Sequence, residues 1–247
     1  KTIKADLLNE KALQNLPQAE NVIYMVGNKF GTTGNEHLSW AVNTFLPGTV
    51  ASKFRNSRIL LFSTGNVYPF TEVKSGGATE KTIPDPRGEY AQSCLGRERI
   101  LEHFSRLYEI PALIFRLNYA IDLRYGVLYD IASSVLEEKA VDLRMGQVNV
   151  IWQGDANEMA LRALSLCESP PEVINVTGPE TISVRWLARW FGEKFQKKPF
   201  FQNEEKDKAL LSNASRAHKL FGYPRVTLRQ MMEWTADWVE KDKPTLN

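Results

Sequence analysis

The sequence predicts an α/β protein in which a parallel sheet is connected by helices. Short apolar runs of strand length alternate along the chain with longer segments whose apolar residues recur at helical spacing. This alternation is typical of parallel sheets with crossover helices and not of antiparallel meanders. With 247 residues and 43% hydrophobic content, the chain is long and apolar enough to bury a sizeable core.

The first half of the chain supplies strands and two long helices. Strands are predicted where apolar residues run together and a turn residue follows, at residues 21–27, 58–63 and 110–117. Helices are predicted over residues 36–54, with an interruption near Pro47 and Gly48, and over residues 89–108.

The second half repeats the alternation with shorter elements. The apolar spacing predicts helices over residues 127–138, 156–167 and 228–241, and strands over residues 147–152 and 173–176. Ser183 is the predicted N-cap of a further helix, because its hydroxyl can accept a backbone N–H of the first turn.

The chain begins unlike a complete nucleotide-binding sheet. Residues 1–6 are predicted to form a strand that ends at Asp6, and a short helix is predicted to follow as far as Leu16. A doubly wound sheet opens with a strand, a glycine-rich turn and a helix, and no such unit precedes Lys1. We therefore expect a doubly wound sheet that is N-terminally incomplete and starts at its third strand.

A glycine-containing loop follows the strand at residues 21–27. Gly27, Gly31 and Gly34 lie between this strand and the next helix, where a pyrophosphate can meet a helix N-terminus. A dinucleotide site also needs a following strand that ends in an acidic residue, and here that strand ends in two hydroxyl residues. The loop is interpreted as an active-site loop or a structural turn, and a nucleotide site in a shorter fold is the alternative.

Thr64 and Tyr90 are the predicted catalytic residues. Thr64 follows a buried strand, and Tyr90 lies near the start of the next long helix. A tyrosinate can exchange a proton with a substrate hydroxyl, while a neighbouring hydroxyl orients the substrate oxygen. The free phenol has a pKa of about 10, so this chemistry needs a nearby cation that lowers it.

Cys94 stands one helical turn after Tyr90, where such a cation is expected. A thiol is neutral or negative, so Cys94 cannot lower the pKa of the phenol. Arg97, about two turns after Tyr90 on roughly the same face, is another source of positive charge. Tyr90 and Cys94 can also be packed helix residues of an inactive protein. No base in the sequence supports Cys94 as a nucleophile.

Several motifs in the same order resemble those of the extended short-chain dehydrogenase/reductases, the NAD-dependent epimerase/dehydratase family. The motifs are residues 43–49, Ser63 to Tyr68, Tyr90 with Glu98, Arg116 to Tyr119, residues 153–156 and residues 175–183. The resemblance implies a Rossmann-like sheet, a smaller C-terminal α/β substrate lobe, and NAD or NADP as the cofactor. Two departures are the missing glycine-rich first unit and Cys94 in place of the lysine in the Tyr-x-x-x-Lys pattern.

The resemblance also assigns binding roles. At the cofactor it places Asp6, Leu7, Val26, Gly27, Ser63, Tyr90 and Asn118. At the substrate, expected to be a nucleotide-sugar, it places Thr64, Gly65, Asn66, Asn118 and Tyr119. Residues 1–122 are the expected cofactor domain, and residues 123–247 are mainly the substrate lobe, with segments that return to the sheet.

The activity implied is that of a nucleotide-sugar epimerase or dehydratase, impaired or altered by Cys94. The residues present are expected to be inactive without the missing first unit. An inactive family scaffold, used for binding or regulation, is the alternative of a different class. The resemblance further implies a homodimer formed through the helices at about residues 35–55 and 89–108.

Composition and charge argue against other classes of partner. The net charge is +2 and the 31 basic residues are scattered, which argues against nucleic acid. No apolar run approaches the ~20 residues of a membrane helix, and the histidines form no ligand-spaced cluster with cysteine for a metal. Two cysteines and the lack of a cationic–apolar leader predict a cytoplasmic protein.

Overall fold

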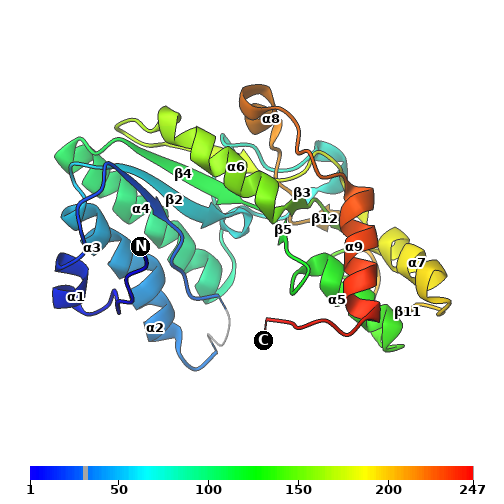
Figure 1. The fold of residues 1–247 in the computed structure, drawn as a ribbon. Helices are drawn as coiled ribbons and strands as arrows, with labels where there is room; N and C mark the ends of the chain where they lie inside the picture. Colours follow the sequence, from blue (N-terminus) through cyan, green and yellow to red (C-terminus); the bar gives the residue numbers. More distant parts are fainter. Residues whose placement is uncertain (30–32, 247) are drawn as a thin grey trace. The chain divides into compact units, whose positions relative to one another are not determined.

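A computed structural model describes residues 1–29 and 33–246 (Figure 1). The chain divides into two compact units. The first unit consists of Lys1–Pro69, Ile83–Arg116 and Ala160–Ile174, and the second of Phe70–Thr82, Leu117–Met159 and Asn175–Asn247. Each unit therefore draws on three separate stretches of the chain. The assignment of cofactor and substrate domains stays a prediction.

The main sheet has four strands, in the order β1 (Asn21–Tyr24), β2 (Arg58–Thr64), β4 (Ala112–Leu117) and β9 (Glu172–Val176). β1 and β2 are parallel, with Asn21 opposite Arg58. The chain passes from the first unit to the second within β4 and again within β9. Each of these four strands matches a predicted strand, but β1 ends at Tyr24 because the exposed residues that follow pair with no strand.

Residues 1–6 form no strand, which corrects the sequence prediction. The segment is mostly exposed, and no strand or isolated bridge of the described residues pairs with it. Asp6 Oδ1 instead accepts the N–H of Leu8 at 3.0 Å, and its carbonyl accepts the N–H of Asn9 at 3.1 Å. The predicted short helix is present as α1 (Glu10–Gln14).

The first long predicted helix is present but changes its winding in the middle. α2 (Glu36–Trp40) continues through a π-helical turn, η1 (Ala41–Phe45), into α3 (Leu46–Lys53). Pro47 has no N–H and cannot donate to the Asn43 carbonyl four residues earlier. The predicted interruption is therefore a local change of winding next to the proline and not a break.

α4 (Gly88–Tyr108) confirms the second long predicted helix. It packs on η1, α3 and β2, and Leu101 belongs to the same buried apolar cluster as Ile59 of β2 (Figure 1). Gly96 allows a close approach to the neighbouring helix, because a Cβ at this position would lie 2.8 Å from Thr44 Oγ1. The approach brings side chains of η1 next to those of α4.

Three helices pack together in the second unit. α5 (Val127–Leu136), α7 (Val184–Phe195) and α9 (Leu228–Glu240) contact one another and enclose an apolar cluster. All three match predicted helices. Ser183 caps α7 as predicted, because its Oγ accepts the N–H of Trp186 at 3.2 Å.

The strand predicted over residues 147–152 divides into two short strands, β7 (Gln147–Val148) and β8 (Ile151–Trp152). Asn149 lies between them, and Thr177 Oγ1 donates to its carbonyl at 3.0 Å. This side-chain bond takes the place of a ladder bond, so the strand is interrupted there. β7 pairs antiparallel with β10 (Ile182–Ser183), and β8 pairs parallel with β5 (Ala120–Ile121).

Short elements complete the two units. Two further strand pairs are β3 (Thr71–Glu72) with β12 (Lys208–Ala209) and β6 (Ala140–Asp142) with β11 (Phe200–Gln202). The remaining helices are α6 (Gln153–Ala163) and α8 (Ser215–Phe221). Single 3-10 turns are η2 (Gly65–Val67), η3 (Val73–Ser75) and η4 (Leu164–Leu166).

Candidate functional site

Thr64 and Tyr90 meet in the first unit where β2 ends. Thr64 is the last residue of β2 and the N-cap of η2, and its Oγ1 accepts the N–H of Asn66 at 3.2 Å. Tyr90 lies in the first turn of α4, and its side chain lies close enough to that of Thr64 for Thr64 to lower the pKa of the phenol. The structure therefore brings together the two predicted catalytic residues, with Gly65 and Asn66 directly after Thr64 in η2.

Cys94 lies one helical turn beyond Tyr90 and is fully buried. Its thiol lies near enough to the Tyr90 phenol for each group to shift the pKa of the other. Burial raises the pKa of the Tyr90 phenol well above its usual range, and Cys94 adds to the rise, while Arg97 and Thr64 lower it. The phenol is therefore protonated at neutral pH.

Burial likewise raises the pKa of the Cys94 thiol. Arg97 and the Tyr90 side chain oppose this rise, with a further contribution from Lys29. The thiol stays protonated at neutral pH, and a protonated thiol is a poor nucleophile. The structure thus gives no support to nucleophilic chemistry at this position.

Arg97 is a buried cation on α4, with 6% of its surface exposed. Its Nε donates to the Asn43 carbonyl at 3.2 Å and its Nη2 to Asn43 Oδ1 at 2.6 Å. Its Nη1 donates to the Phe62 carbonyl at 2.9 Å. Because Pro47 has no N–H, it cannot donate to the Asn43 carbonyl within the helix. The Arg97 side chain donates to this carbonyl instead.

Asn43 holds the loop after β1 against two helices. Its Oδ1 accepts the N–H of Asn28 at 2.8 Å, and its Nδ2 donates to the Asn28 carbonyl at 2.9 Å. The same Nδ2 donates to Ser93 Oγ on α4 at 3.0 Å. The sequence indicates Asn43 only as part of the motif at residues 43–49, because spacing alone does not reveal which loop a buried amide contacts.

Val26 and Gly27, both predicted at the cofactor, lie in this loop and are exposed. A Cβ on Gly27 would lie 2.8 Å from Arg97 Nη2, so the glycine leaves room for the guanidinium. Gly31 of the alternative nucleotide loop lies outside the described residues. The alternative nucleotide site is therefore still a sequence prediction.

A buried ion pair joins α4 to β4 in the first unit. Arg116 donates to Glu98 through Nη2 at 2.6 Å and through Nε at 2.9 Å, and both side chains are buried. Arg116 Nη1 donates to Tyr68 Oη at 2.6 Å, and Ser63 Oγ donates to Glu98 Oε1 at 2.5 Å. Ser63 thus directs its hydroxyl into this network, and its cofactor contact stays a prediction.

Asp6 and Leu7, predicted at the cofactor, lie in the segment before α1. Asp6 is exposed, and Leu7 packs partly buried against the apolar cluster of the first unit. Neither forms a hydrogen bond with Thr64 or Tyr90 in the described part of the chain. Their cofactor roles stay predictions.

Asn118 and Tyr119 belong to the second unit. Asn118 is buried, and its Nδ2 donates to Asn149 Oδ1 at 2.8 Å while its N–H donates to the Val176 carbonyl at 2.9 Å. Tyr119 has a positive φ of 43° and lines a cavity of about 300 Å³ within this unit. Burial raises the pKa of its phenol. Asn118 therefore supports the fold locally, and the ligand contacts predicted for Asn118 and Tyr119 stay predictions.

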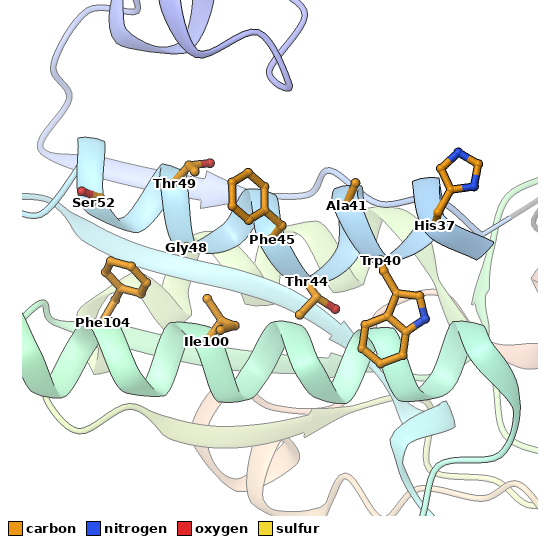
Figure 2. Close-up of a pocket in the computed structure, with 10 residues that line it drawn as sticks. All are labelled: His37, Trp40, Ala41, Thr44, Phe45, Gly48, Thr49, Ser52, Ile100 and Phe104. Carbon is orange, nitrogen blue, oxygen red and sulfur yellow. The ribbon is translucent and has the colours of Figure 1, made fainter. Parts of the chain in front are cut away.

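A groove of about 660 Å³ runs along α2, η1, α3 and α4 (Figure 2). Its lining is His37, Trp40, Ala41, Thr44, Phe45, Gly48, Thr49, Ser52, Ile100 and Phe104. Figure 2 shows Ile100 and Phe104 directed from α4 toward the neighbouring helix. Phe45 is 66% exposed, and exposed apolar surface of this kind marks interaction sites.

Neither a metal-binding cluster nor a membrane-spanning helix is found among the described residues. Within residues 1–29 and 33–246, no three His, Cys, Asp or Glu side chains are grouped so that they could hold a metal ion. In the same part of the chain, no helix is both long enough and apolar enough to span a membrane.

Solved structures match the chain over nearly its whole length. RMD from Pseudomonas aeruginosa, complexed with NADPH, has a TM-score of 0.82 at 20% identity, covering 97% of this chain and 88% of its own. UDP-glucose 4-epimerase from Thermotoga maritima, with UDP-glucose, has a TM-score of 0.80 at 18% identity, covering 96% of this chain and 83% of its own. dTDP-glucose 4,6-dehydratase from Bacillus anthracis, in complex with NAD, has a TM-score of 0.81 at 18% identity, covering 97% of this chain and 79% of its own.

These comparisons establish the fold. No family model and no curated protein matches the sequence. The chain has the Rossmann-like α/β fold of nucleotide-sugar epimerases and dehydratases, so the fold class predicted from its motifs is confirmed. The roles of the individual site residues stay predictions.

Proposed function

We propose that the protein is an NAD(P)-dependent oxidoreductase of the epimerase/dehydratase type that acts on a nucleotide-sugar. The observation that carries the proposal is the close pairing of the Thr64 and Tyr90 side chains where β2 ends. Such a pair can bind a substrate oxygen and move a proton to or from it. The fold supports the proposal, since the similar structures include epimerases and dehydratases with bound NAD.

The residues beside the pair fit the nicotinamide end of a dinucleotide. Val26 and Gly27 expose a small apolar side chain and bare backbone in a loop that Asn43 fixes to α4. Val26, Gly27 and Tyr90 are the residues that would hold this end, with Asp6 at the adenine end. A bound nicotinamide supplies hydride transfer, which side chains do not perform.

Tyr90 exchanges the proton, and Thr64 positions the substrate oxygen. Because burial keeps the phenol protonated at neutral pH, the site is ready to donate a proton to a carbonyl oxygen. Accepting a proton from a substrate hydroxyl requires the tyrosinate, which a higher pH or a nearby positive charge favours. Proton donation is therefore the easier direction for the site as it stands.

The sugar is proposed to contact the segment after Thr64 in the first unit, and a small molecule is separately proposed to bind in the second unit. Gly65 and Asn66 directly follow Thr64 in η2. In the second unit, the cavity beside Tyr119 has a volume of about 300 Å³, which is within the range of small-molecule pockets. Asn118 is the predicted neighbour of both ligands.

A panel of substrates tests the proposal. The full-length protein is incubated with NAD⁺ or NADP⁺ and with UDP-glucose, UDP-glucuronic acid or dTDP-glucose, and products are resolved by chromatography and NMR. Conversion that is lost in Thr64→Val supports the proposal. A protein that binds a dinucleotide but converts none of the sugars contradicts it for these substrates.

An inactive scaffold is the second candidate function. The observation in its favour is the Tyr90 phenol, which burial and the Cys94 thiol both keep protonated. The scaffold predicts that Cys94→Lys produces no turnover, whereas an impaired enzyme would change its rate. The same assay with the variant therefore separates the two candidates.

We further propose that the protein is a homodimer in which two copies cover the groove of Figure 2. Phe45→Glu places a charge in this apolar surface, so we expect it to convert the dimer to a monomer in size-exclusion chromatography with light scattering. Leu161→Glu is the matched control, because Leu161 is 62% exposed on α6 and outside the groove. A monomeric wild type, or a Phe45→Glu dimer, would contradict the proposal.

A cytoplasmic location is also proposed. Cys94 and Cys167 are both free thiols in the structure, as expected of a reducing compartment.

A further inference from the structure

Arg97 brings a permanent positive charge to the row of α4 that carries Tyr90. Residues four and seven positions apart on a helix share a face, so Tyr90, Cys94 and Arg97 lie along one side of α4. A guanidinium cannot be deprotonated in a protein, so its charge is present at every working pH. Its burial places this charge where solvent screening is weak.

The hydrogen bonds of Arg97 orient its charge without cancelling it. The acceptors on Asn43 and Phe62 are amide and carbonyl oxygens, which are neutral. Glu98 follows Arg97 on α4 and faces Cys94, but its carboxylate forms its ion pair with Arg116. A buried cation with neutral acceptors exerts a stronger field on its neighbours than one paired with a carboxylate.

The other titratable groups near this row do not replace Arg97. Arg97 lowers the pKa values of Tyr90, Cys94 and Tyr24, and its guanidinium carbon lies 5.9 Å from the centre of the Tyr24 ring. Lys29, from the loop after β1, acts on Cys94 and is exposed, so solvent screens it. Arg97 is thus the buried cation that acts on the Tyr90 phenol.

We propose that Arg97 replaces the lysine of the Tyr-x-x-x-Lys pattern as the positioning cation for Tyr90. This inference rests on the proposed function and names a residue that favours the proton-accepting direction of Tyr90. Cys94, one helical turn after Tyr90, is neutral. Arg97, about two turns after Tyr90, supplies the positive charge. Gly27 leaves the space that the guanidinium occupies. Arg97 acts through Tyr90 by favouring the tyrosinate.

The test is a titration of the phenol at position 90 without cofactor or substrate. Tyr90 is replaced by 3,5-difluorotyrosine, whose fluorines make the phenol more acidic and report its ionisation by ¹⁹F NMR. Arg97→Gln is expected to raise the pKa of this phenol by about one unit, a tenfold loss of phenolate at a given pH. Arg97→Lys keeps the charge and is expected to keep most of the effect.

Arg99→Gln is the matched control, because Arg99 is an exposed arginine on the same helix. It is expected to leave the phenol pKa unchanged. Arg97→Met, which keeps an apolar stem in place, repeats the test if Arg97→Gln does not fold. A phenol pKa that is unaffected by neutralising Arg97, or that Arg99→Gln raises equally, overturns the inference. The titration needs neither cofactor nor sugar. If the protein converts no sugar of the substrate panel, the proposed function is contradicted, and the titration result for Arg97 is unaffected.

Discussion

Replacing Arg116 with methionine is expected to lower the free energy of unfolding by about 3–5 kcal/mol. The substitution leaves the Glu98 carboxylate buried without the cation that donates two hydrogen bonds to it. Ser63 Oγ remains as a donor, but a neutral hydroxyl does not offset the charge. Urea unfolding followed by tryptophan fluorescence measures the loss.

Arg229→Met is the control for this substitution. Arg229 pairs with Glu233 on an exposed face of α9, so its loss is expected to cost less than about 1 kcal/mol. Glu98→Gln combined with Arg116→Met is expected to recover part of the stability, because no charge then remains buried. If Arg116→Met costs no more than Arg229→Met, the buried pair does not support the first unit as described.

Replacing Tyr90 with phenylalanine is expected to reduce kcat by about 100- to 10,000-fold while the fold is retained. The variant keeps the ring that packs on α4 and removes only the hydroxyl that contacts Thr64. Steady-state rates on the sugar that the panel identifies measure the effect. Tyr108→Phe, on an exposed position of the same helix, is expected to keep the wild-type rate.

The pH profile supplies a second measurement on Tyr90. Its folded pKa is raised above the ordinary value, so the tyrosinate fraction is small at neutral pH and grows tenfold for each pH unit below that pKa. The rate in the proton-accepting direction is therefore expected to rise between about pH 6 and pH 9 without a plateau. A flat profile, or a Tyr90→Phe variant as active as the wild type, would show that Tyr90 does not carry the proton.

The contact between Thr64 and Tyr90 could be predicted because its signals are local. Thr64 ends an uninterrupted apolar strand, and Tyr90 opens a long helix with regular apolar spacing. In parallel α/β sheets the carboxyl ends of the strands form the site, so a strand end followed by a helix start indicates contact. The cap at Ser183 was predictable for the same reason.

The contacts that hold the charges around Tyr90 could not be predicted, although the spacing indicated Arg97 itself, because those contacts depend on partners far away in the sequence. The acceptors of Arg97 lie 54 and 35 residues before it, and Arg116 lies 18 residues after Glu98. The error at residues 1–6 has a related cause, since a strand forms only where a neighbouring strand can pair with it, and six residues alone do not show whether one is present.

Dinucleotide binding is the most direct test of whether the Thr64–Tyr90 pair belongs to a cofactor-dependent enzyme. The full-length protein is titrated with NAD⁺, NADH, NADP⁺ and NADPH, with tryptophan fluorescence as the signal. Val26→Asp places a carboxylate where Val26, 37% exposed, is proposed to line the cofactor, and Leu161→Asp makes the same change on the exposed face of α6. We expect at least one dinucleotide to bind with a micromolar Kd that Val26→Asp weakens about tenfold or more and Leu161→Asp leaves unchanged. No binding of any dinucleotide, or equal binding by the two variants, would contradict the proposed function.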